Sequence, residues 1–433
     1  MTSTLLKKAS LNAPTLYHLP NGLTIIAEHL PVEAVSFNIW LNVGSAKEFD
    51  DINGMAHFLE HMVFKGTPNL NMGEFERSIE ERGAVTNAAT SQDYTQYYIT
   101  TAPKDFAELA PLQLDVVLNP TIADDAFERE RLVVLEEIRR SEDNPRRRTF
   151  YRSMETCFEK LPYRRPVLGP ASVIENLQSQ QMRDFHNCWY QPASMTAVVV
   201  GNLPVEQLIE IVAEGFERHN LELKTSCETF LHLPASTPEL PFTEILRREY
   251  TDETLQQARL VMMWRVPGMM ELEETYALDL LSVILGQGKV SRLYRDLREE
   301  RGLVTQISVS NMTHTHQGVF YISAQLPTEN IEEVEKAIAQ HIYRLQTEPI
   351  PDKDIARLRT QIANRFIFAN ERPSDRANLY GYYYSQLQNL EPALNYPQYI
   401  QKIEAEDLQA AAQKYLSAEA YALVVMTPSS QKE

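Results

Sequence analysis

The chain has 433 residues, of which 43% are hydrophobic and 23% charged, a composition typical of a globular protein long enough for more than one domain. Its formal net charge of −18 would repel the phosphates of a nucleic acid. No apolar run approaches the roughly 20 residues of a membrane-spanning helix, and the first thirty residues contain no signal-type hydrophobic block. We therefore expect a cytoplasmic protein with no nucleic-acid partner and no membrane partner.

The three cysteines, Cys157, Cys188 and Cys227, are widely spaced and form no C-x-x-C pair. This pattern favours a reducing compartment and argues against a thiolate zinc site. We expect the cysteines to be packing residues.

The first predicted elements are two strands joined by a turn at Asn21-Gly22, since this dipeptide is a strong hairpin signal. The segment "SFNIWLNVG" reads as the next strand, and "QYYITTAP" at 96–103 as a later one. Helices follow at "DFAELAPLQLDVV" and "FERERLVVLEEI", where apolar residues recur at three- and four-residue steps. We expect mixed or antiparallel sheets with helices packed on them.

The same order of elements occurs twice. Tyr97 and Phe320 occupy matching strands 223 positions apart, and Thr196 and Ala422 occupy matching later strands 226 positions apart. This near-constant offset predicts an α+β protein made of two homologous α/β domains. The expected division is an N-terminal domain at 1–220, a linker at 221–245 around "HLPASTPELP", and a degenerate repeat domain at 246–433.

The segment "HFLEH" places His57, Glu60 and His61 on one face of a helix. Two imidazoles there could hold a zinc ion at about 2.0–2.1 Å, while the glutamate takes a proton from water on the metal. This is the inverted counterpart of the H-E-x-x-H motif. Adding 223 to His57 gives Leu280, so the second repeat has no matching histidine.

A catalytic zinc ion needs a third protein ligand, which we expect from a second helix. The helix predicted at 127–142 offers several carboxylates, and periodicity does not choose among them: Glu128, Glu130, Glu136, Glu137 and Glu142.

These motifs resemble those of the pitrilysin-type (inverzincin) zinc peptidases, most closely the β subunit of mitochondrial processing peptidase and its bacterial relatives. The resemblance rests on H-x-x-E-H followed by "FKGT", then "GAVTNAATSQDYTQYY", then "ERERLVVLEEI", and it extends through both repeats. It implies a half-clamshell fold. It also implies that His57, His61 and Glu137 bind one Zn²⁺ per chain, that Glu60 is the general base, and that Glu130 orients the site.

By the same resemblance, the segment "NAATSQD" is a substrate-binding edge strand. Asn87, Ala88, Ala89 and Thr90 would pair with an extended peptide, and Phe64 would line the pocket for the residue after the cut. An ordinary edge strand would contain the same residues.

The family also places an arginine and a tyrosine, seven residues apart, against the substrate carbonyl. Here Arg298 matches the arginine, but Thr305 stands at the tyrosine position. The resemblance therefore implies a partner that supplies the Arg and Tyr pair, either a paralogous subunit without zinc or a second copy of the chain.

The resulting prediction is a zinc-dependent endopeptidase that cleaves unfolded or extended peptides, as the catalytic subunit of a two-chain clamshell. The alternative is a non-catalytic structural core subunit of a larger complex. A maturation protease dedicated to one modified peptide would have the same sequence features. The stretch "NPRRRTFYR" is basic where the mitochondrial enzyme is acidic, so we expect no preference for arginine near the cut.

Overall fold

A computed structural model describes residues 13–218 and 237–429, which form two compact units. Within the described part of the chain, the first unit contains residues 13–139, 166–218 and 366–395. The second unit contains residues 140–165, 237–365 and 396–429. The predicted boundaries at 220 and 245 follow the sequence repeat and stay a prediction, because the compact units are not contiguous in sequence.

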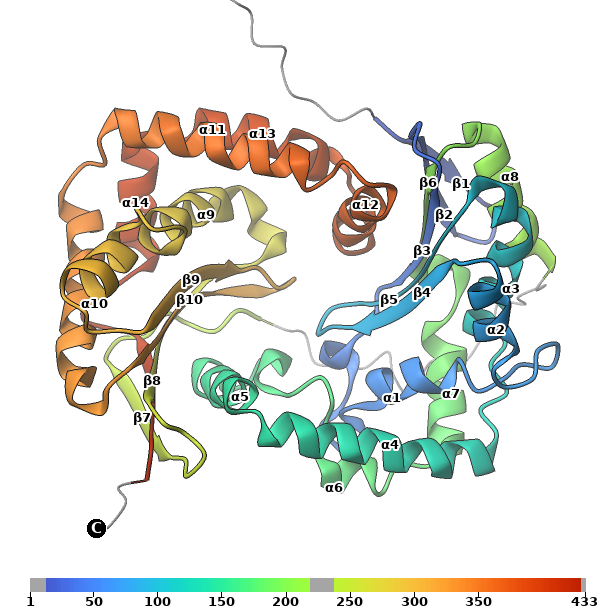
Figure 1. Ribbon diagram of the computed structural model, residues 1–433, viewed down its shortest axis with the longest axis horizontal. Helices are drawn as coiled ribbons and strands as arrows, with labels where there is room; N and C mark the ends of the chain where they lie inside the picture. Colours follow the sequence, from blue (N-terminus) through green and yellow to red (C-terminus); the bar gives the residue numbers. More distant parts are fainter. Residues whose placement is uncertain (1–12, 219–236, 430–433) are drawn as a thin grey trace, which may run out of the picture. The chain divides into compact units, whose positions relative to one another are not determined.

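The first unit is built on a six-stranded sheet (Figure 1). In spatial order its strands are β1 (Thr15–His18), β2 (Thr24–His29), β6 (Met195–Gly201), β3 (Val35–Leu41), β5 (Thr95–Thr101) and β4 (Val85–Thr90). Only β2 and β6 are parallel. The Asn21-Gly22 hairpin is confirmed: Gly22 has φ +90° between β1 and β2, and His18 pairs with Thr24.

The second unit repeats this topology in a five-stranded sheet. Its strands are β7 (Leu246–Thr251), β11 (Ala422–Thr427), β8 (Ala258–Pro267), β10 (Gln317–Leu326) and β9 (Gln306–Met312). Only β7 and β11 are parallel, as the matching β2 and β6 are in the first sheet. The predicted fold class, two homologous domains with mixed sheets and packed helices, is confirmed.

Helices surround each sheet. The longer ones of the first unit are α1 (Met55–Met62), α2 (Glu74–Glu81), α3 (Phe106–Leu118), most of α4 (Asp124–Asp143), α7 (Ser179–Trp189), α8 (Val205–Arg218) and α12 (Pro373–Leu387). Those of the second unit are α5 (Pro145–Cys157), α9 (Leu272–Gly286), the π-helix η7 (Tyr294–Glu300), α10 (Ile331–Thr347), most of α11 (Asp352–Phe368), most of α13 (Glu391–Lys402) and α14 (Ala405–Tyr415).

The shorter helices complete the two units. They are η1 (Ser45–Lys47), η2 (Asp50–Ile52), η3 (Pro103–Asp105), η4 (Pro162–Arg164), α6 (Ala171–Ile174), η5 (Pro192–Ser194), η6 (Met269–Glu271) and η8 (Thr328–Asn330).

The two repeats exchange one helix. Helix α12, from the C-terminal half of the sequence, packs on β3 and β6 of the first sheet, while α5, from the N-terminal half, packs on β8 and β11 of the second (Figure 1). A buried ion pair of 2.8 Å between Arg376 of α12 and Glu28 of β2 accompanies the apolar contacts, and the Tyr380 hydroxyl donates to the same carboxylate. Each sheet is therefore completed by a helix from the other repeat.

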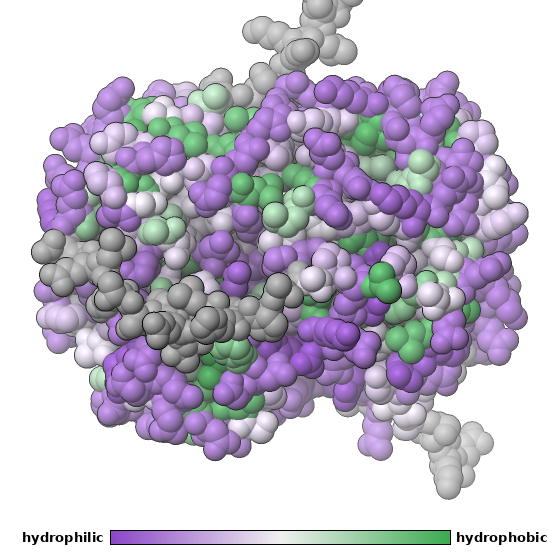
Figure 2. Space-filling model, turned by 180° about the vertical axis from the view of Figure 1, so that it is seen from behind, coloured by the Kyte–Doolittle hydropathy of each residue, from purple (hydrophilic) through white to green (hydrophobic). Residues whose placement is uncertain are grey.

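The surface is largely hydrophilic on the face shown in Figure 2, with hydrophobic side chains in small groups among polar ones. None of the helices in the described ranges combines the length and the hydrophobicity needed to cross a bilayer.

The cysteines differ from expectation. Cys157 is free and buried, as expected of a packing residue. Cys188 is disulfide-bonded, so the prediction was wrong for this residue. Cys227 lies outside the described residues. The cytoplasmic location stays a prediction, and Cys188 does not support the cysteine argument for it.

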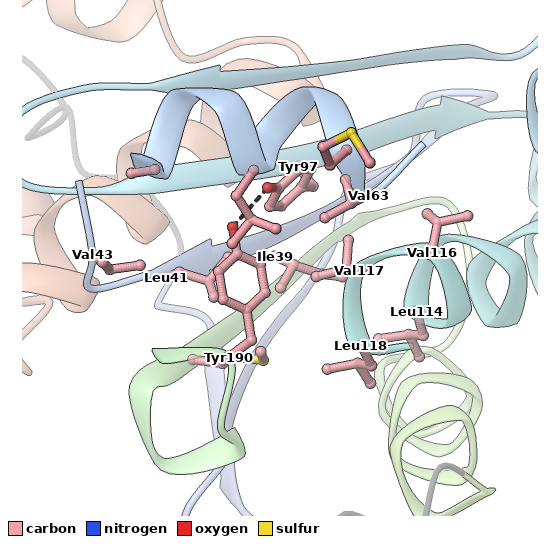
Figure 3. Close-up of a cluster of buried hydrophobic side chains, with 14 of the residues drawn as sticks. Ile39, Leu41, Val43, Val63, Tyr97, Leu114, Val116, Val117, Leu118 and Tyr190 are labelled. Carbon is pink, nitrogen blue, oxygen red and sulfur yellow. Dashed lines mark hydrogen bonds between the residues drawn. The ribbon is translucent and has the colours of Figure 1, made fainter. Parts of the chain in front are cut away.

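The core of the first unit lies between the sheet and α3, α7 and α8. Figure 3 shows part of it, in which aliphatic residues of β3 and α3 surround Tyr97 and Tyr190. Both tyrosines are buried, and a hydrogen bond of 2.8 Å joins their hydroxyl groups. This core supports the strand and the helix that carry the site described next.

Candidate metal centre

Helix α1 carries the two histidines, and its first turn is fixed by a buried carboxylate. The Glu48 side chain accepts hydrogen bonds from the main-chain N–H groups of Gly54 (2.8 Å) and Ala56 (2.7 Å). A carboxylate at this end satisfies N–H groups that have no partner in the helix and interacts favourably with the helix dipole. Gly54 is needed because its φ is +100° and a Cβ there would lie 2.5 Å from the Leu168 carbonyl oxygen. The start of α1 is therefore held in one place.

The predicted ligands meet. His57 Nε2 lies 3.6 Å from Glu137 Oε2, and His61 Nε2 lies 3.5 Å from the same oxygen. One nitrogen or oxygen atom from each of the three residues lies within 4.8 Å of the others. Ligands bound tetrahedrally to zinc at about 2.1 Å lie about 3.4 Å from one another. The His-His-Glu donor set therefore fits a zinc ion with a fourth position left for water or substrate.

Helix α4 brings one carboxylate to the two histidines, a carboxylate that periodicity alone could not choose. Glu137 faces the histidines, whereas Glu128 binds Arg131 and Glu136 binds Arg139 on the same helix. Glu130 lies about two helical turns before Glu137 on the same side of α4, where it contacts His61.

Glu130 contacts the ring nitrogen of His61 that faces away from Glu137. Its Oε1 lies 2.9 Å from His61 Nδ1, and its Oε2 lies 2.8 Å from Lys65 Nζ. Burial lowers the pKa of His61, but hydrogen bonds to Glu130 and Glu137 outweigh burial and raise this pKa to about 9. Burial raises the pKa of Glu130, and its bonds to His61 and Lys65 more than offset that effect. The carboxylates that favour a proton on His61 would also favour a divalent cation at Nε2, which takes the place of that proton.

The turn after α1 brings Lys65 to Glu130. The Thr67 hydroxyl donates to the buried carboxylate of Asp115 on α3 (2.5 Å) and accepts from the N–H of Leu70 (3.0 Å). Gly66 reverses the chain at φ +107°, a conformation that suits glycine. The sequence "FKGT" thus forms a hydrogen-bonded turn that places Lys65 beside Glu130, the carboxylate that also contacts His61.

Glu60, the predicted general base, is bound to strand β4. The Thr90 hydroxyl donates a hydrogen bond to Glu60 Oε2. Burial raises the pKa of Glu60, and the bond from Thr90 opposes this shift in part. A carboxylate whose pKa is raised is better suited to accept and return a proton near neutral pH.

Strand β4 is an edge strand, paired with β5 on one side only. Val85, Asn87 and Ala89 are exposed, and Ala88 and Thr90 are half-buried. The Ala88 N–H donates to Oδ1 of the adjacent Asn87 at 2.9 Å. Helix α1 packs against β4, which places the predicted peptide-binding edge beside the helix that carries His57 and His61.

Phe64, the predicted pocket residue, lies two residues after the end of α1 and is half-buried. Its ring stacks on Phe75 at 5.9 Å between centroids and lies 6.0 Å from the ring of Tyr97. These contacts fix the ring next to α1.

Arg298 and Thr305 belong to the second unit. Arg298 Nη1 donates to the Tyr294 hydroxyl at 2.6 Å, one turn earlier on η7. The Thr305 hydroxyl lies within hydrogen-bond distance of two acceptors, Gln257 Oε1 (2.9 Å) and the Gln325 carbonyl oxygen (3.1 Å), and its one hydrogen can go to either. The Thr305 hydroxyl is therefore already engaged by residues of the second unit.

Sequence reasoning missed Lys65 and the role of the Thr90 side chain. Lys65 stands four residues after His61, at helical spacing, inside the quoted "FKGT". That spacing could have suggested a cation beside the site, but its partner Glu130 is far away in sequence.

Comparison with known proteins agrees with this geometry. Residues 24–171 match the family model described as insulinase (peptidase family M16), and residues 176–362 match the model described as peptidase M16 inactive domain. The chain belongs to the pitrilysin-type M16 peptidase family.

Individual relatives are distant but cover almost the whole chain. A protein named zinc protease PqqE from Helicobacter pylori is 28% identical over 92% of this chain and 89% of its own length. A protein from Rickettsia felis that is named as a zinc protease is 26% identical over 92% of this chain and 94% of its own length.

Solved structures give the same result. The crystal structure of a protease from Helicobacter pylori matches with a TM-score of 0.89 and 26% identity, covering 96% of this chain and 99% of the other. The structure of a putative M16-like peptidase from Alicyclobacillus acidocaldarius has a TM-score of 0.84 at 20% identity, covering 96% and 98%, and shares the fold.

Proposed function

We propose that the protein is a zinc-dependent endopeptidase that cleaves unfolded or extended peptides. The observation that supports this most strongly is the placement of the base. Glu60 is hydrogen-bonded to the last residue of an open strand edge and stands within one helical turn of two of the three proposed metal ligands. A peptide added to β4 would therefore run past the base and the metal together.

His57, His61 and Glu137 would hold the ion. Zinc, when bound, would polarise the scissile carbonyl group and lower the pKa of a bound water molecule. Glu60 would accept the proton of that water and return it to the leaving amine. Thr90 keeps the carboxylate of Glu60 turned toward the edge strand, and Glu130 fixes the ring of His61.

The free edge of β4 would bind the substrate main chain. Strand addition satisfies main-chain hydrogen bonds whatever the side chains are, which suits a peptidase with broad sequence tolerance. Asn87, Ala88, Ala89 and Thr90 would form this edge, and Phe64 would contact the residue that follows the cut.

The test is metal content together with cleavage. We expect the purified chain, assayed with and without the partner proposed below, to bind one zinc ion and to cleave an unstructured peptide, with loss of cleavage on chelation and recovery on adding zinc. Glu60→Gln should keep the zinc and lower kcat by about 10²- to 10⁴-fold. Glu80→Gln, on the exposed surface of α2, is the matched control and should change neither property. A chain that binds no zinc would favour the structural-subunit alternative, and Glu60→Gln with full activity would contradict the assigned base.

We also propose that full activity requires a second chain. Arg298 stands where the family resemblance implies an arginine, but Thr305 stands where it implies a tyrosine. The Thr305 hydroxyl is engaged with Gln257 and Gln325, so it does not replace the phenol of that tyrosine. A paralogous subunit without zinc, or a second copy of this chain, would supply the Arg and Tyr pair. Turnover by a monomer that is not increased by any partner would contradict this, and would direct attention to Tyr294, which already contacts Arg298.

A further inference from the structure

A row of polar residues crosses the second sheet and is partly covered by α5. The pairing register places Arg259 of β8 opposite Gln325 of β10, and Gln325 opposite Gln306 of β9. Residues opposite one another in neighbouring strands point to the same face and are about 5 Å apart. Arg259, Gln325 and Gln306 therefore form one continuous row of hydrogen-bonding side chains.

Helix α5 passes over both ends of this row. The Thr149 hydroxyl contacts the sulfur of Met426, which is the residue opposite Arg259 on β11, and Arg146 Nη2 donates to Gln306 Oε1 at 3.4 Å. The guanidinium of Arg146 is thus brought toward the face that carries Arg259.

Within residues 13–218 and 237–429, no carboxylate forms a salt bridge with Arg259 or Arg146. Arg259 Nε is fully buried, and no acceptor among the described residues is within hydrogen-bond reach of it. Burial, and then the charge of Arg146, lower the pKa of Arg259. The carboxylate of Asp252 also acts on Arg259, but it is already bound to Arg148 at 2.6 Å. Two guanidinium groups brought together without a carboxylate between them repel each other, and a buried donor without a partner is unfavourable.

A bound carboxylate would remove both unfavourable features. It would accept hydrogen bonds from Arg259 and Arg146, and the amide of Gln306 can donate to the same ligand. The Gln325 amide already donates to Gln257 Oε1 at 3.1 Å, which leaves its second N–H for the ligand. These two arginines lie near one another in a chain whose formal net charge is −18. An attractive site for acidic groups on such a chain has to be built locally.

We propose that this row, Arg259, Gln325 and Gln306 together with Arg146, is a binding site for an acidic side chain of a peptide. The choice of a peptide as ligand rests on the proposed endopeptidase function. The site would make the protein prefer substrates that carry glutamate or aspartate, which also gives a physical reason for the basic stretch at the start of α5.

The experiment measures peptide binding to the Glu60→Gln protein, in which turnover is suppressed. Two short unstructured fluorescent peptides, both amidated at the C-terminus, differ only by one Glu or Gln. We expect the Glu peptide to bind about tenfold tighter at low salt, with a smaller difference at high salt. Adding Arg259→Gln should remove the difference between the peptides.

Arg147→Gln is the matched control. It removes the same charge from the next position of α5, where the side chain is exposed and points around the helix from Arg146. It should leave the Glu preference intact. Arg259→Lys keeps the charge without the planar guanidinium and should restore part of the preference, which also shows that the site tolerates substitution without unfolding.

Equal affinity for the two peptides, absence of saturable binding of the Glu peptide, or equal effects of Arg259→Gln and Arg147→Gln would each overturn the proposal. A Gln peptide with a free C-terminus tests the other source of a carboxylate. Tighter binding of this peptide than of the Glu peptide would overturn the side-chain assignment. Failure of the endopeptidase function would instead be seen as missing zinc or missing cleavage by the wild-type protein, which the binding assay does not measure.

Discussion

The two repeats differ at the positions where the first carries its proposed metal ligands. With the offset of 223, His57, Glu60 and His61 of α1 correspond to Leu280, Val283 and Ile284 of α9, which are all buried and apolar. The helices α4 and α11 begin 228 positions apart, so Glu130 corresponds to Leu358, which is also buried. The five strands that the two units share, all except β1, nevertheless follow the same order. The fold therefore does not depend on the polar site. A helix packed against an edge strand is stable with either polar or apolar side chains at these positions.

The largest expected effect comes from giving α1 the residues of α9. The double change His57→Leu and His61→Ile removes two of three ligands, so we expect the zinc Kd to rise by at least about 1000-fold. The fold should persist, because the second repeat holds apolar residues at both positions. Competition with a zinc chelator and circular dichroism check the two expectations. His29→Leu, at the end of β2, is the control. Zinc affinity close to that of the wild type would show that these histidines are not ligands.

The reverse change tests whether the second repeat can accept a polar side chain. Leu280→His places an imidazole in a core position that is 0% exposed, and we expect the free energy of unfolding to fall by about 2–4 kcal/mol. No zinc should bind, because the neighbouring positions hold Val283 and Ile284. Urea denaturation gives the stability, and a loss below about 0.5 kcal/mol would mean that α9 is packed more loosely than described.

A smaller effect is expected from Lys65, which acts on the ligands through Glu130. Lys65→Met leaves Glu130 with His61 as its remaining described partner, and we expect the zinc Kd to rise about 10-fold or more. Lys65→Arg should recover most of the affinity. The visible absorption of the cobalt-substituted protein would report any change in ligand geometry.

The double variant with Glu130→Gln sharpens this test. If Lys65 acts through Glu130, the second substitution should add little to the first. Fully additive effects, or tighter zinc binding in Lys65→Met, would indicate a direct effect of the lysine charge and contradict the positioning role.

The smallest expected effect concerns the link between base and edge strand. Thr90→Val removes the hydroxyl that holds Glu60, and we expect kcat to fall about 3- to 10-fold with zinc affinity unchanged. Thr90→Ser keeps the hydroxyl and should restore most of kcat. Steady-state kinetics separate this result from a change in KM, which would point to the peptide-binding edge instead.

The fold could be predicted from the sequence because the repeat presents the pattern of each matching strand and helix twice. Strands ending near Thr101 and Leu326 were found by their likeness to each other, and the Asn21-Gly22 turn carries its own conformational preference. The helix exchange was not predicted. The sequence offset relates α5 to α12, but it contains no information about which of two similar sheets each helix covers.

The site was predicted where spacing is local and missed where contacts are distant. His57, Glu60 and His61 share a helix face by periodicity alone. The choice of Glu137 came from the family resemblance, and the structure gives its physical basis, since Glu128 and Glu136 bind arginines of their own helix. The bond from Thr90 to Glu60 depends on packing between a helix and a strand, and no short-range pattern encodes it. The prediction that Cys188 is a packing residue was wrong because cysteine spacing in the sequence does not reveal proximity in space.

The position of α12 has a consequence for biosynthesis. The first sheet is complete in sequence when Gly201 of β6 has been made, but the helix that covers Ile26, Trp40 and Val198 ends about 190 residues later, at Leu387. At bacterial or eukaryotic translation rates that interval is roughly 10–40 s. During this time the nascent chain carries a bare apolar sheet face, which makes ribosome-associated chaperones and a steady rate of elongation natural requirements for its production.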